Sequence, residues 1–231
     1  MPYLYETHLH TKEGSVCGVS GGRDYIQRYL DLGYTGIIIT DHFFRGNCRP
    51  DRNLPWEKWV SEFCQGYENA RDEGARRGLD VFFGWEETID GNDYLVYGLD
   101  REWLLLHPEA VSFTLEEQFE AVNSGGGCVV HAHPFRYSLR SIPHSKNILV
   151  NAVEAANSGN NQISDALAWV HAKNLKLPIT AGSDIHYAKD IHPSIVFGVY
   201  LEKRMESIAD YVNAIINNTI TGLSIPKNRF A

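Results

Sequence analysis

The sequence has few cysteines, and none of them form a pair spaced as in a zinc ribbon or a redox motif. Its four cysteines are scattered along the chain: Cys17, Cys48, Cys64 and Cys128. Without a CxxC motif, neither a disulfide framework nor a cysteine-based zinc site is indicated. We therefore expect small core cysteines in a protein of the reducing cytoplasm.

Long apolar runs and an excess of positive charge are also missing. No apolar stretch approaches the roughly 18 residues of a membrane span, and the opening residues 1–6 do not resemble a signal peptide. The net charge is −8 and the pI is about 5.7. Such a surface has no global attraction for anionic membranes or nucleic acid. We expect no membrane partner, and no nucleic-acid partner beyond a nucleotide or a short oligonucleotide.

The sequence also lacks the signatures of a covalent nucleophile. It has no Gly-x-Ser-x-Gly elbow and no competing Cys–His constellation. The length of 231 residues and an apolar content of 43% suit one domain with a full core. We therefore expect a single domain spanning residues 1–231.

What the sequence does have is metal-ligand residues at the ends of five apolar segments. These motifs are His8-Leu9-His10, Thr40-Asp41-His42, Gly84-Trp85-Glu86, His131-Ala132-His133-Pro134 and Ser183-Asp184-Ile185-His186. Histidines at positions i and i+2 of a strand project to one side. Imidazole and carboxylate together suit zinc, manganese or iron. Five such motifs in one modest domain indicate a multinuclear metalloenzyme.

The chain alternates between strand and helix signals. Residues 22–32 have helical spacing, and residues 36–40 form a buried apolar run. Residues 43–55 have no periodicity and predict a loop over the site, after which a long amphipathic helix runs from Trp56 and stops before Gly78.

The alternation continues in the second half of the chain. Strands are predicted at 79–83, 94–97, 152–155 and 195–201, with helices after Thr114 and from about Ile208. A further helix is predicted to bury Ile163, Ala166, Leu167 and Val170. Alternating strands and helices predict parallel strands, and about seven βα units fit a small or incomplete barrel. Each metal-ligand motif would then lie at the carboxyl end of a strand, where such barrels place their chemistry.

The ordered motifs resemble those of the PHP family, named for polymerase and histidinol phosphatase. The series is His-x-His, Thr-Asp-His, Gly-x-Glu, His-Pro and Ser-Asp-x-His, and it runs from His8 to about Gly198. The resemblance implies an α/β fold, a distorted (β/α)7 barrel of the TIM-like kind. It also implies two or three divalent metals and hydrolysis of phosphate esters.

The resemblance assigns ligands by motif position. The first metal would be held by His8, His10, Glu86 and Asp184. Glu86 would bridge to a second metal, which His133 also binds. His42 and His186 would hold a third.

Two positions depart from the family pattern. Relatives often carry a ligand in the loop after the first motif, where this chain offers Glu13 or Cys17. They also often carry a histidine on the strand after the glutamate, where this chain has Asp93. His131 is the other candidate for that role. We name Glu13 as the expected additional ligand.

Clustered cations predict a mechanism that needs no protein nucleophile. They lower the pKa of a bound water from 15.7 towards about 7, and the resulting metal-bound hydroxide attacks the phosphate ester. Asp184 and His186 are the expected catalytic residues among the ligands, and His186, His192 or a bound water would protonate the leaving group. Arg136 is the expected phosphate-binding residue, because its planar fork binds two oxygens at once. The other candidates are Arg140, Lys189, Arg23, Arg45, Arg49 and Arg52.

The predicted substrate is a small phosphorylated metabolite or nucleotide, of which histidinol phosphate is one possibility. An amidohydrolase-type metal hydrolase is the alternative enzyme, although the strand ends carry Glu86 and His133 where a carboxylated lysine would be expected. A catalytically decayed metal-binding module is the non-enzyme alternative. Asp41 is expected to orient a ligand, and Glu154 to be an ordinary polar strand end.

Overall fold

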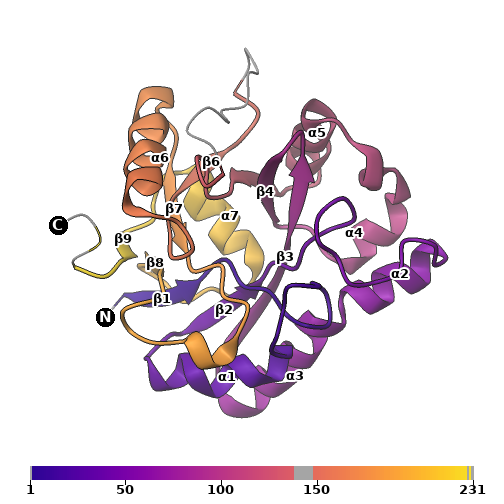
Figure 1. Ribbon diagram of the computed structural model, residues 1–231, viewed down its shortest axis with the longest axis horizontal. Coiled ribbons are helices and arrows are strands. Elements are labelled where there is room, and N and C mark those ends of the chain that lie inside the picture. The colour runs from indigo at the N-terminus through magenta and orange to yellow at the C-terminus, as the bar shows by residue number, and fades with distance from the viewer. Residues whose placement is uncertain (1, 138–147, 228, 230–231) are drawn as a thin grey trace.

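One sheet, curled on itself, organises the molecule. The computed structural model describes residues 2–137, 148–227 and 229. Its nine described strands follow the order β7-β6-β5-β4-β3-β2-β1-β8-β9 (Figure 1). Because β7 also lies against β8 and β9, the sheet is a nearly closed barrel. The predicted α/β, TIM-like barrel is therefore confirmed.

The strands are short, apart from β3. They are β1 Tyr3–Glu6, β2 Gly36–Ile39, β3 Asp80–Ile89, β4 Asn92–Tyr97, β5 Cys128–His131, β6 Ala152–Asn157, β7 Ile179–Gly182, β8 Gly198–Leu201 and β9 Gly222–Ser224. The pairs β1–β2, β2–β3, β5–β6 and β6–β7 are parallel. Strand β4 pairs antiparallel with both β3 and β5, and β8 pairs antiparallel with β1 and β9. The expectation of parallel strands throughout is thus wrong at β4, β8 and β9.

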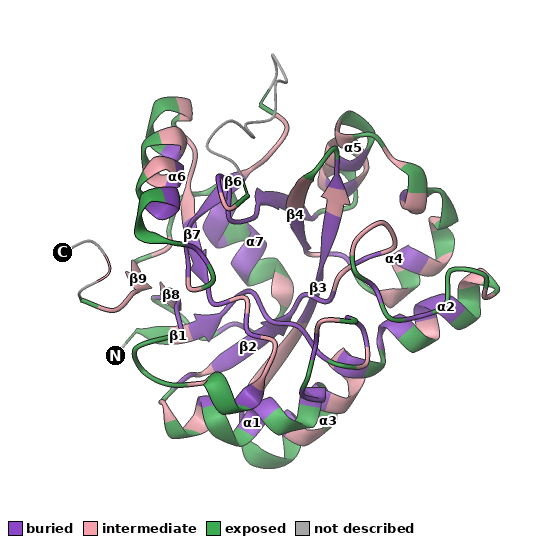
Figure 2. Cartoon of the chain, viewed as in Figure 1, coloured by how far each residue is buried: buried purple, intermediate pink, exposed green. Residues whose placement is uncertain are grey.

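Helices surround the sheet and turn their exposed faces to solvent (Figure 2). They are α1 Gly22–Asp31, α2 Trp56–Phe63, α3 Gln65–Arg77, α4 Arg101–Leu106, α5 Leu115–Ser124, α6 Gln162–Leu175 and α7 Ile208–Ile216, with 3-10 turns at Pro108–Ser112 and Ala188–Asp190. The predicted long helix is two helices, α2 and α3, which meet at Cys64. The predicted capping box of α5 is present, because Thr114 accepts from the backbone of Glu117. No described helix has the length and apolar character needed to cross a bilayer.

The side chains of each strand alternate between two cores. On β2, Ile37 and Ile39 pack outward against α1 and α3, whereas Ile38 points into the barrel. On β4, Tyr94 packs outward and Leu95 inward. This period of two fixes which residues can reach the barrel interior. Helix α7 packs against the inner residues and closes one end of the barrel.

Helix α6 buries a different face from the one predicted. Ile163, Ala166 and Val170 are exposed, and Leu167 is half-buried. The buried residues of the helix are Ser164, Asp165, Ala168 and Ala172. The two alanines pack on Val153 and Ala155 of β6, where a larger side chain would not allow so close an approach. The prediction from apolar periodicity is wrong here because α6 contacts the sheet through small and hydrogen-bonded residues.

Helix α1 crosses α3 at two glycines. A Cβ at Gly22 would lie 2.1 Å from the carbonyl oxygen of Gly66. We predict that Gly22→Ala lowers the free energy of unfolding by about 1–3 kcal/mol, because the helices must move apart. Urea denaturation measures the change. Arg28→Ala, at an exposed position of the same helix, is the control and should stay within about 0.5 kcal/mol of the wild type. Equal midpoints for Gly22→Ala and wild type would contradict this packing.

Candidate metal centre

The first motif places two imidazoles inside the barrel mouth. Strand β1 ends at Glu6, and Leu9 continues the pairing through a bridge to Ile185. Leu9 packs outward, so His8 and His10 both face inward, as the i,i+2 spacing predicts. Their Nε2 atoms lie 3.1 Å apart, and Nε2 of His10 is 3.0 Å from Oδ1 of Asp184. His8, His10 and Asp184 form one group that could hold a cation.

Glu86 joins a second group to the first. It lies within β3, beyond the part that pairs with β2, and not at the end of the strand as expected. Its Oε1 atom is 2.8 Å from Nε2 of His133 and 3.5 Å from Nε2 of His8. His8, Glu86 and His133 form a fully buried group of candidate ligands. The Glu86 carboxylate therefore lies between the imidazoles of the two groups.

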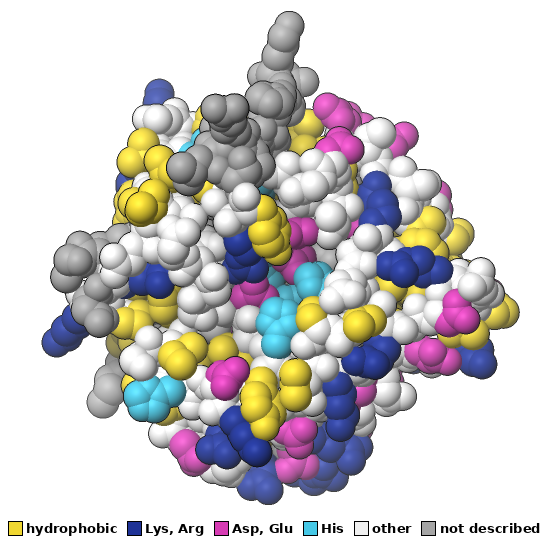
Figure 3. All heavy atoms as spheres, in the orientation of Figure 1, with side chains coloured by type: hydrophobic (Ala, Val, Ile, Leu, Met, Phe, Trp, Pro, Cys, Tyr) yellow, Lys and Arg dark blue, Asp and Glu magenta, His cyan; other side chains and the backbone are white. Residues whose placement is uncertain are grey.

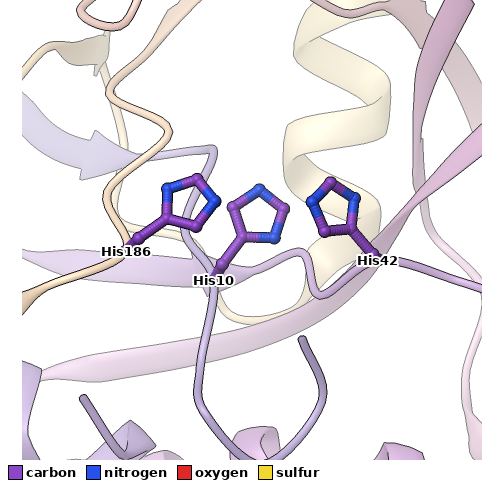
Figure 4. A group of neighbouring side chains, drawn as sticks. All are labelled: His10, His42 and His186. Atoms are coloured by element: carbon purple, nitrogen blue, oxygen red, sulfur yellow. The ribbon is translucent and has the colours of Figure 1, made fainter. Parts of the chain in front are cut away.

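Three imidazoles form a third group. His10 lies between His42 and His186, with ring centroids 4.3 Å and 4.5 Å away respectively (Figure 4). His186 directs Nδ1 at the backbone oxygen of Asp184, 2.8 Å away. Nε2 is therefore the nitrogen of this ring that could bind a cation. His10 belongs to two of the groups, so the three sites are contiguous.

A hollow gives solvent access to this cluster. Histidine and acidic side chains gather at the centre of one face of the molecule, beside a basic side chain (Figure 3). The cavity there has a volume of about 440 Å³. Its lining includes His42, Glu86, His133, Arg136, Asp184 and His186. A cavity of this size suits a small ligand.

Charge inside the cluster is concentrated on two carboxylates. Burial alone would raise the pKa of Glu86 and Asp184, but the surrounding imidazoles hold both values well below the ordinary range. Burial, together with the charge of the neighbouring His42, lowers the pKa of His10 to about 3. His10 is therefore neutral and offers a lone pair, as a metal ligand must.

The residues present fit divalent cations. Oε2 of Glu86 and Nδ1 of His42 are buried and have no hydrogen-bond partner, although they lie only 2.9 Å apart. Buried polar atoms without partners are rare in native proteins. Carboxylates and imidazoles that face one another are the donor set of zinc, manganese and iron sites. A cation between these atoms would satisfy both.

Glu154 orients a ligand, a role that the sequence did not reveal. Its Oε1 atom accepts from Nδ1 of His8 at 3.0 Å, and its Oε2 atom accepts from the backbone N–H of His133 at 2.9 Å. A carboxylate behind an imidazole fixes the tautomer in which Nε2 faces the metal. The available signal was the parity of β6, since Ala152 points inward and Glu154 therefore does too.

Asp41 contacts His10 indirectly, through the hydroxyl group of Ser15. Its carboxylate accepts from Thr11 and from Oγ of Ser15, at 2.7 Å for the latter. Oγ of Ser15 lies 3.3 Å from Nδ1 of His10. The predicted orienting role of Asp41 thus has a defined path in the structure. Burial raises the pKa of Asp41 to about 6, against the effect of these hydrogen bonds.

The structure does not bring Glu13 to the cluster. Its carboxylate accepts from the backbone N–H of Gly22 at 3.2 Å and from Asn69 at 3.1 Å, so it sits at the start of helix α1. Cys17, the other candidate from this loop, lines the cavity instead. Burial alone would raise the pKa of the Cys17 thiol, but hydrogen bonding to His186 and His42 lowers it to about 6.

Of the two candidates for the missing strand histidine, Asp93 lies at the cavity and His131 does not. Oδ2 of Asp93 lies 3.9 Å from Nε2 of His133, and the residue lines the cavity. His131 faces outward and stacks on Tyr94 at 5.2 Å. We expected His131 and His133 to share a strand face, but β5 ends at His131 and His133 has a φ of 25°. The turn reverses the direction of the second side chain.

Arg136 lies beside the cluster, as expected of a phosphate-binding residue, but it also holds a ligand in place. Its guanidinium donates to Asp184, to Asn157 and to Oδ1 of Asn160, the last at 3.0 Å. These contacts use three of its five N–H groups. The other two have no partner among the described residues.

The other candidate cations are engaged elsewhere. Arg45, Arg49 and Arg52 donate to backbone oxygens of Phe113, Val16 and Phe44 respectively. Arg23 binds Asn69, and Lys189 is exposed above the ring of Tyr187. His192 is exposed and contacts Ser194. Arg140 lies outside the described residues.

Comparison with solved structures identifies the fold as PHP-like. A candidate metal-dependent phosphoesterase from Bifidobacterium adolescentis is 16% identical with a TM-score of 0.59, over 94% of this chain and 96% of that one. A two-domain Bacteroides vulgatus protein with a predicted PHP-like metal-dependent phosphoesterase is 14% identical with a TM-score of 0.63. The match covers 95% of this chain and 64% of that protein. No protein-family model and no curated protein matches the sequence.

The same comparison includes an amidohydrolase. This protein from Chromobacterium violaceum, with bound sulfate and no metal, is 14% identical with a TM-score of 0.56, over 91% of this chain and 96% of that chain. At these identities the likeness establishes the fold alone. The choice between hydrolase classes must therefore come from the side chains of the site.

We predict that Glu154→Gln weakens metal binding by about 10- to 100-fold. If the new amide nitrogen faces His8, that ring must accept at Nδ1, and its proton moves to Nε2, the atom that faces the cluster. If the amide oxygen faces His8, the nitrogen opposes the N–H of His133. Competition with a chelator measures the affinity.

Glu116→Gln provides the matched control. Glu116 is exposed in the first turn of α5, so its variant should bind metal as the wild type does. Circular dichroism of the metal-free variants checks that both fold. An unchanged affinity in Glu154→Gln would show that this carboxylate does not orient His8.

Proposed function

We propose that this protein is a metal-dependent phosphoesterase that acts on a small phosphorylated metabolite or nucleotide. The observation that carries the proposal is the contiguity of the three ligand groups, which share His8 and His10 and open on one cavity. Two or three divalent cations held there would lower the pKa of a water molecule and neutralise phosphoryl oxygens. The metals in view are zinc, manganese and iron, which this donor set accepts alike.

The chain's own residues supply binding and proton transfer. Arg136 lines the cavity, and two of its five N–H groups have no partner among the described residues, so its planar fork could bind two phosphoryl oxygens. His186 is the most accessible of the clustered imidazoles, with a side-chain exposure of 31%, and can reach a leaving group. Its Nδ1 atom points at the backbone, so Nε2 is the atom that would exchange a proton or bind a cation. Asp184 binds both Arg136 and His10 and therefore couples phosphate recognition to metal binding.

An amidohydrolase reaction is the second candidate, and one structural neighbour carries that description. An amide substrate has no phosphoryl dianion to pair with the positive charge of Arg136, which lines the cavity. Among the described residues, no lysine lines the cavity. These observations favour the phosphate ester. Residence in the cytoplasm and the absence of a membrane partner stay predictions from the sequence.

Metal content gives the first test of this proposal. We predict that the purified protein, after incubation with zinc, manganese or iron, carries at least two equivalents of metal, because buried carboxylates and imidazoles without cations are costly. Elemental analysis measures the stoichiometry. The loaded protein is then assayed against phosphomonoesters, phosphodiesters and N-acyl amides. Less than half an equivalent of metal, or turnover of amides alone, would overturn the proposal.

Two kinds of variant separate metal binding from phosphate recognition. His10→Ala should abolish turnover and reduce bound metal, because His10 belongs to two ligand groups. Arg136→Ala should keep its metal at saturating concentration, while kcat/KM falls about ten- to a hundredfold through loss of a charge-assisted bond of roughly 1.5–3 kcal/mol.

Arg49→Ala removes an exposed arginine that binds a backbone oxygen, and it should behave as the wild type. Full activity in Arg136→Ala would place phosphate recognition elsewhere. Full metal content and activity in His10→Ala would contradict the whole assignment of the site.

A further inference from the structure

A turn at residues 157–160, at the end of β6, holds the guanidinium of Arg136. Nε of Arg136 donates to Oδ1 of Asn160 at 3.0 Å, and its Nη2 donates to Oδ1 of Asn157. Gly159 packs so closely against this group that a Cβ there would lie 2.9 Å from Nη2 of Arg136. Both asparagines are buried. The orientation of Arg136 therefore depends on the position of this turn.

A buried carboxylate at the start of α6 fixes the turn. Oδ1 of Asp165 accepts from Nδ2 of Asn160 at 2.8 Å and from the backbone N–H of Asn157 at 3.3 Å. The Asp165 side chain is fully buried, so its charge needs a partner of opposite sign in addition to these hydrogen bonds. The group that compensates this charge also fixes the turn that holds Arg136.

Arg229, in the segment after β9, supplies that partner. Its Nε donates to Oδ2 of Asp165 at 2.8 Å, and its Nη2 donates to the backbone oxygens of Asn157 at 2.9 Å and Asn160 at 2.7 Å. The guanidinium lies over the ring of Phe197, 5.3 Å from its centroid. One arginine thus binds the backbone of the turn and also the carboxylate that holds the turn's side chains.

We propose that Arg229 is a positioning residue for phosphate recognition, which acts through Asp165 and the turn at 157–160 to orient Arg136 at the cavity. Among the described residues, Arg229 does not line the cavity, so it acts only through its neighbours. Each step of the path is a hydrogen bond between buried or largely buried groups, where such bonds are strong and hold a defined geometry. The inference rests on the proposed function, because it takes Arg136 as the phosphate-binding residue. The orientation of Arg136 is nevertheless measurable without a substrate.

The Nε–H signal of Arg136 in the nitrogen–proton NMR spectrum of the full chain reports that orientation. Arg136→Ala identifies the signal by its disappearance. We expect slow exchange with water in the wild type, because this N–H is hydrogen-bonded to Asn160 in a side chain that is 16% exposed. Arg229→Ala should broaden or remove the signal. Lys227→Ala, which removes an exposed cation of the same segment, is the control and should keep it.

Binding of inorganic phosphate to the metal-loaded protein, followed by titration calorimetry, connects this orientation to recognition. Arg229→Ala should weaken phosphate binding about tenfold, a typical effect within one hydrogen-bond network. In the Arg136→Ala background the same change should have no further effect, because Arg229 acts through the residue already removed. A purely structural role would lower the affinity by the same factor in both backgrounds. Lys227→Ala should bind phosphate as the wild type does.

Arg229→Lys covers the case in which Arg229→Ala does not fold. Lysine keeps the positive charge beside Asp165, but its ammonium cannot reproduce the planar arrangement of Nε and Nη2. We expect this variant to fold, to broaden the Arg136 signal and to weaken phosphate binding by a smaller factor than Arg229→Ala. Circular dichroism checks the folding of every variant.

The outcomes separate this inference from the proposed function. If the Arg136 signal is unchanged in a folded Arg229 variant, or if the loss of phosphate affinity is equal in both backgrounds, the positioning role is wrong and the proposed function stands. If the signal is lost in Arg229→Ala but the wild type binds no phosphate, Arg229 does orient Arg136 and phosphate recognition fails. If the signal is unchanged and no phosphate binds, both fail.

Discussion

The structure depends on keeping two ionised carboxylates, Glu86 and Asp184, inside a protein that can hardly solvate them. Their side chains are 1% and 4% exposed. An unpaired charge in such a place costs several kcal/mol, so the surroundings must supply positive charge or hydrogen bonds. Imidazoles arrive from four separate strand ends and Arg136 from the turn after β5. The barrel mouth is the place where the carboxyl ends of these strands can meet. Bound cations would complete the compensation that the imidazoles begin.

A second ring of buried carboxylates holds this first ring in place. Glu6 accepts hydrogen bonds from the backbone N–H groups of His8 at 3.0 Å and Ser183 at 2.9 Å. It therefore links β1 to the segment after β7. Glu154 ties β6 to the first motif, and Asp41 ties the segment after β2 to the loop that follows the histidines. Each carboxylate is fully or almost fully buried. Hydrogen bonds to backbone N–H groups stabilise such charges, and they also fix the spacing of the strand ends. The precision of the metal ligands thus comes from residues that never touch the metal.

The sequence predicted the inner ring better than the outer one, and the reason is physical. Ligands such as His8 and Glu86 follow apolar runs, and parallel strands must bring the ends of those runs together. Glu154 belongs to the outer ring, and its role depends on which face of β6 is inward, a fact that only the pairing of neighbouring strands fixes. The antiparallel insertion of β4 could not be predicted because a short apolar strand carries no sign of its direction. His131 was placed on the wrong side because the change of direction after β5 comes from a backbone turn, not from the side-chain pattern.

Two of the ligands occupy backbone conformations that side chains rarely adopt. His133 has a φ of 25° and Asp184 a φ of 57°, both in the left-handed region. Such conformations cost about 1–3 kcal/mol each and persist only when the surrounding contacts over-determine them. Here those contacts are visible: Glu154 accepts from the backbone N–H of His133, and the N–H of Asp184 donates to the backbone oxygen of His8 at 2.8 Å. The turns point both side chains back into the barrel instead of along the strand. The fold therefore stores local strain at the two positions where a regular strand would direct the ligand away from the metal centre.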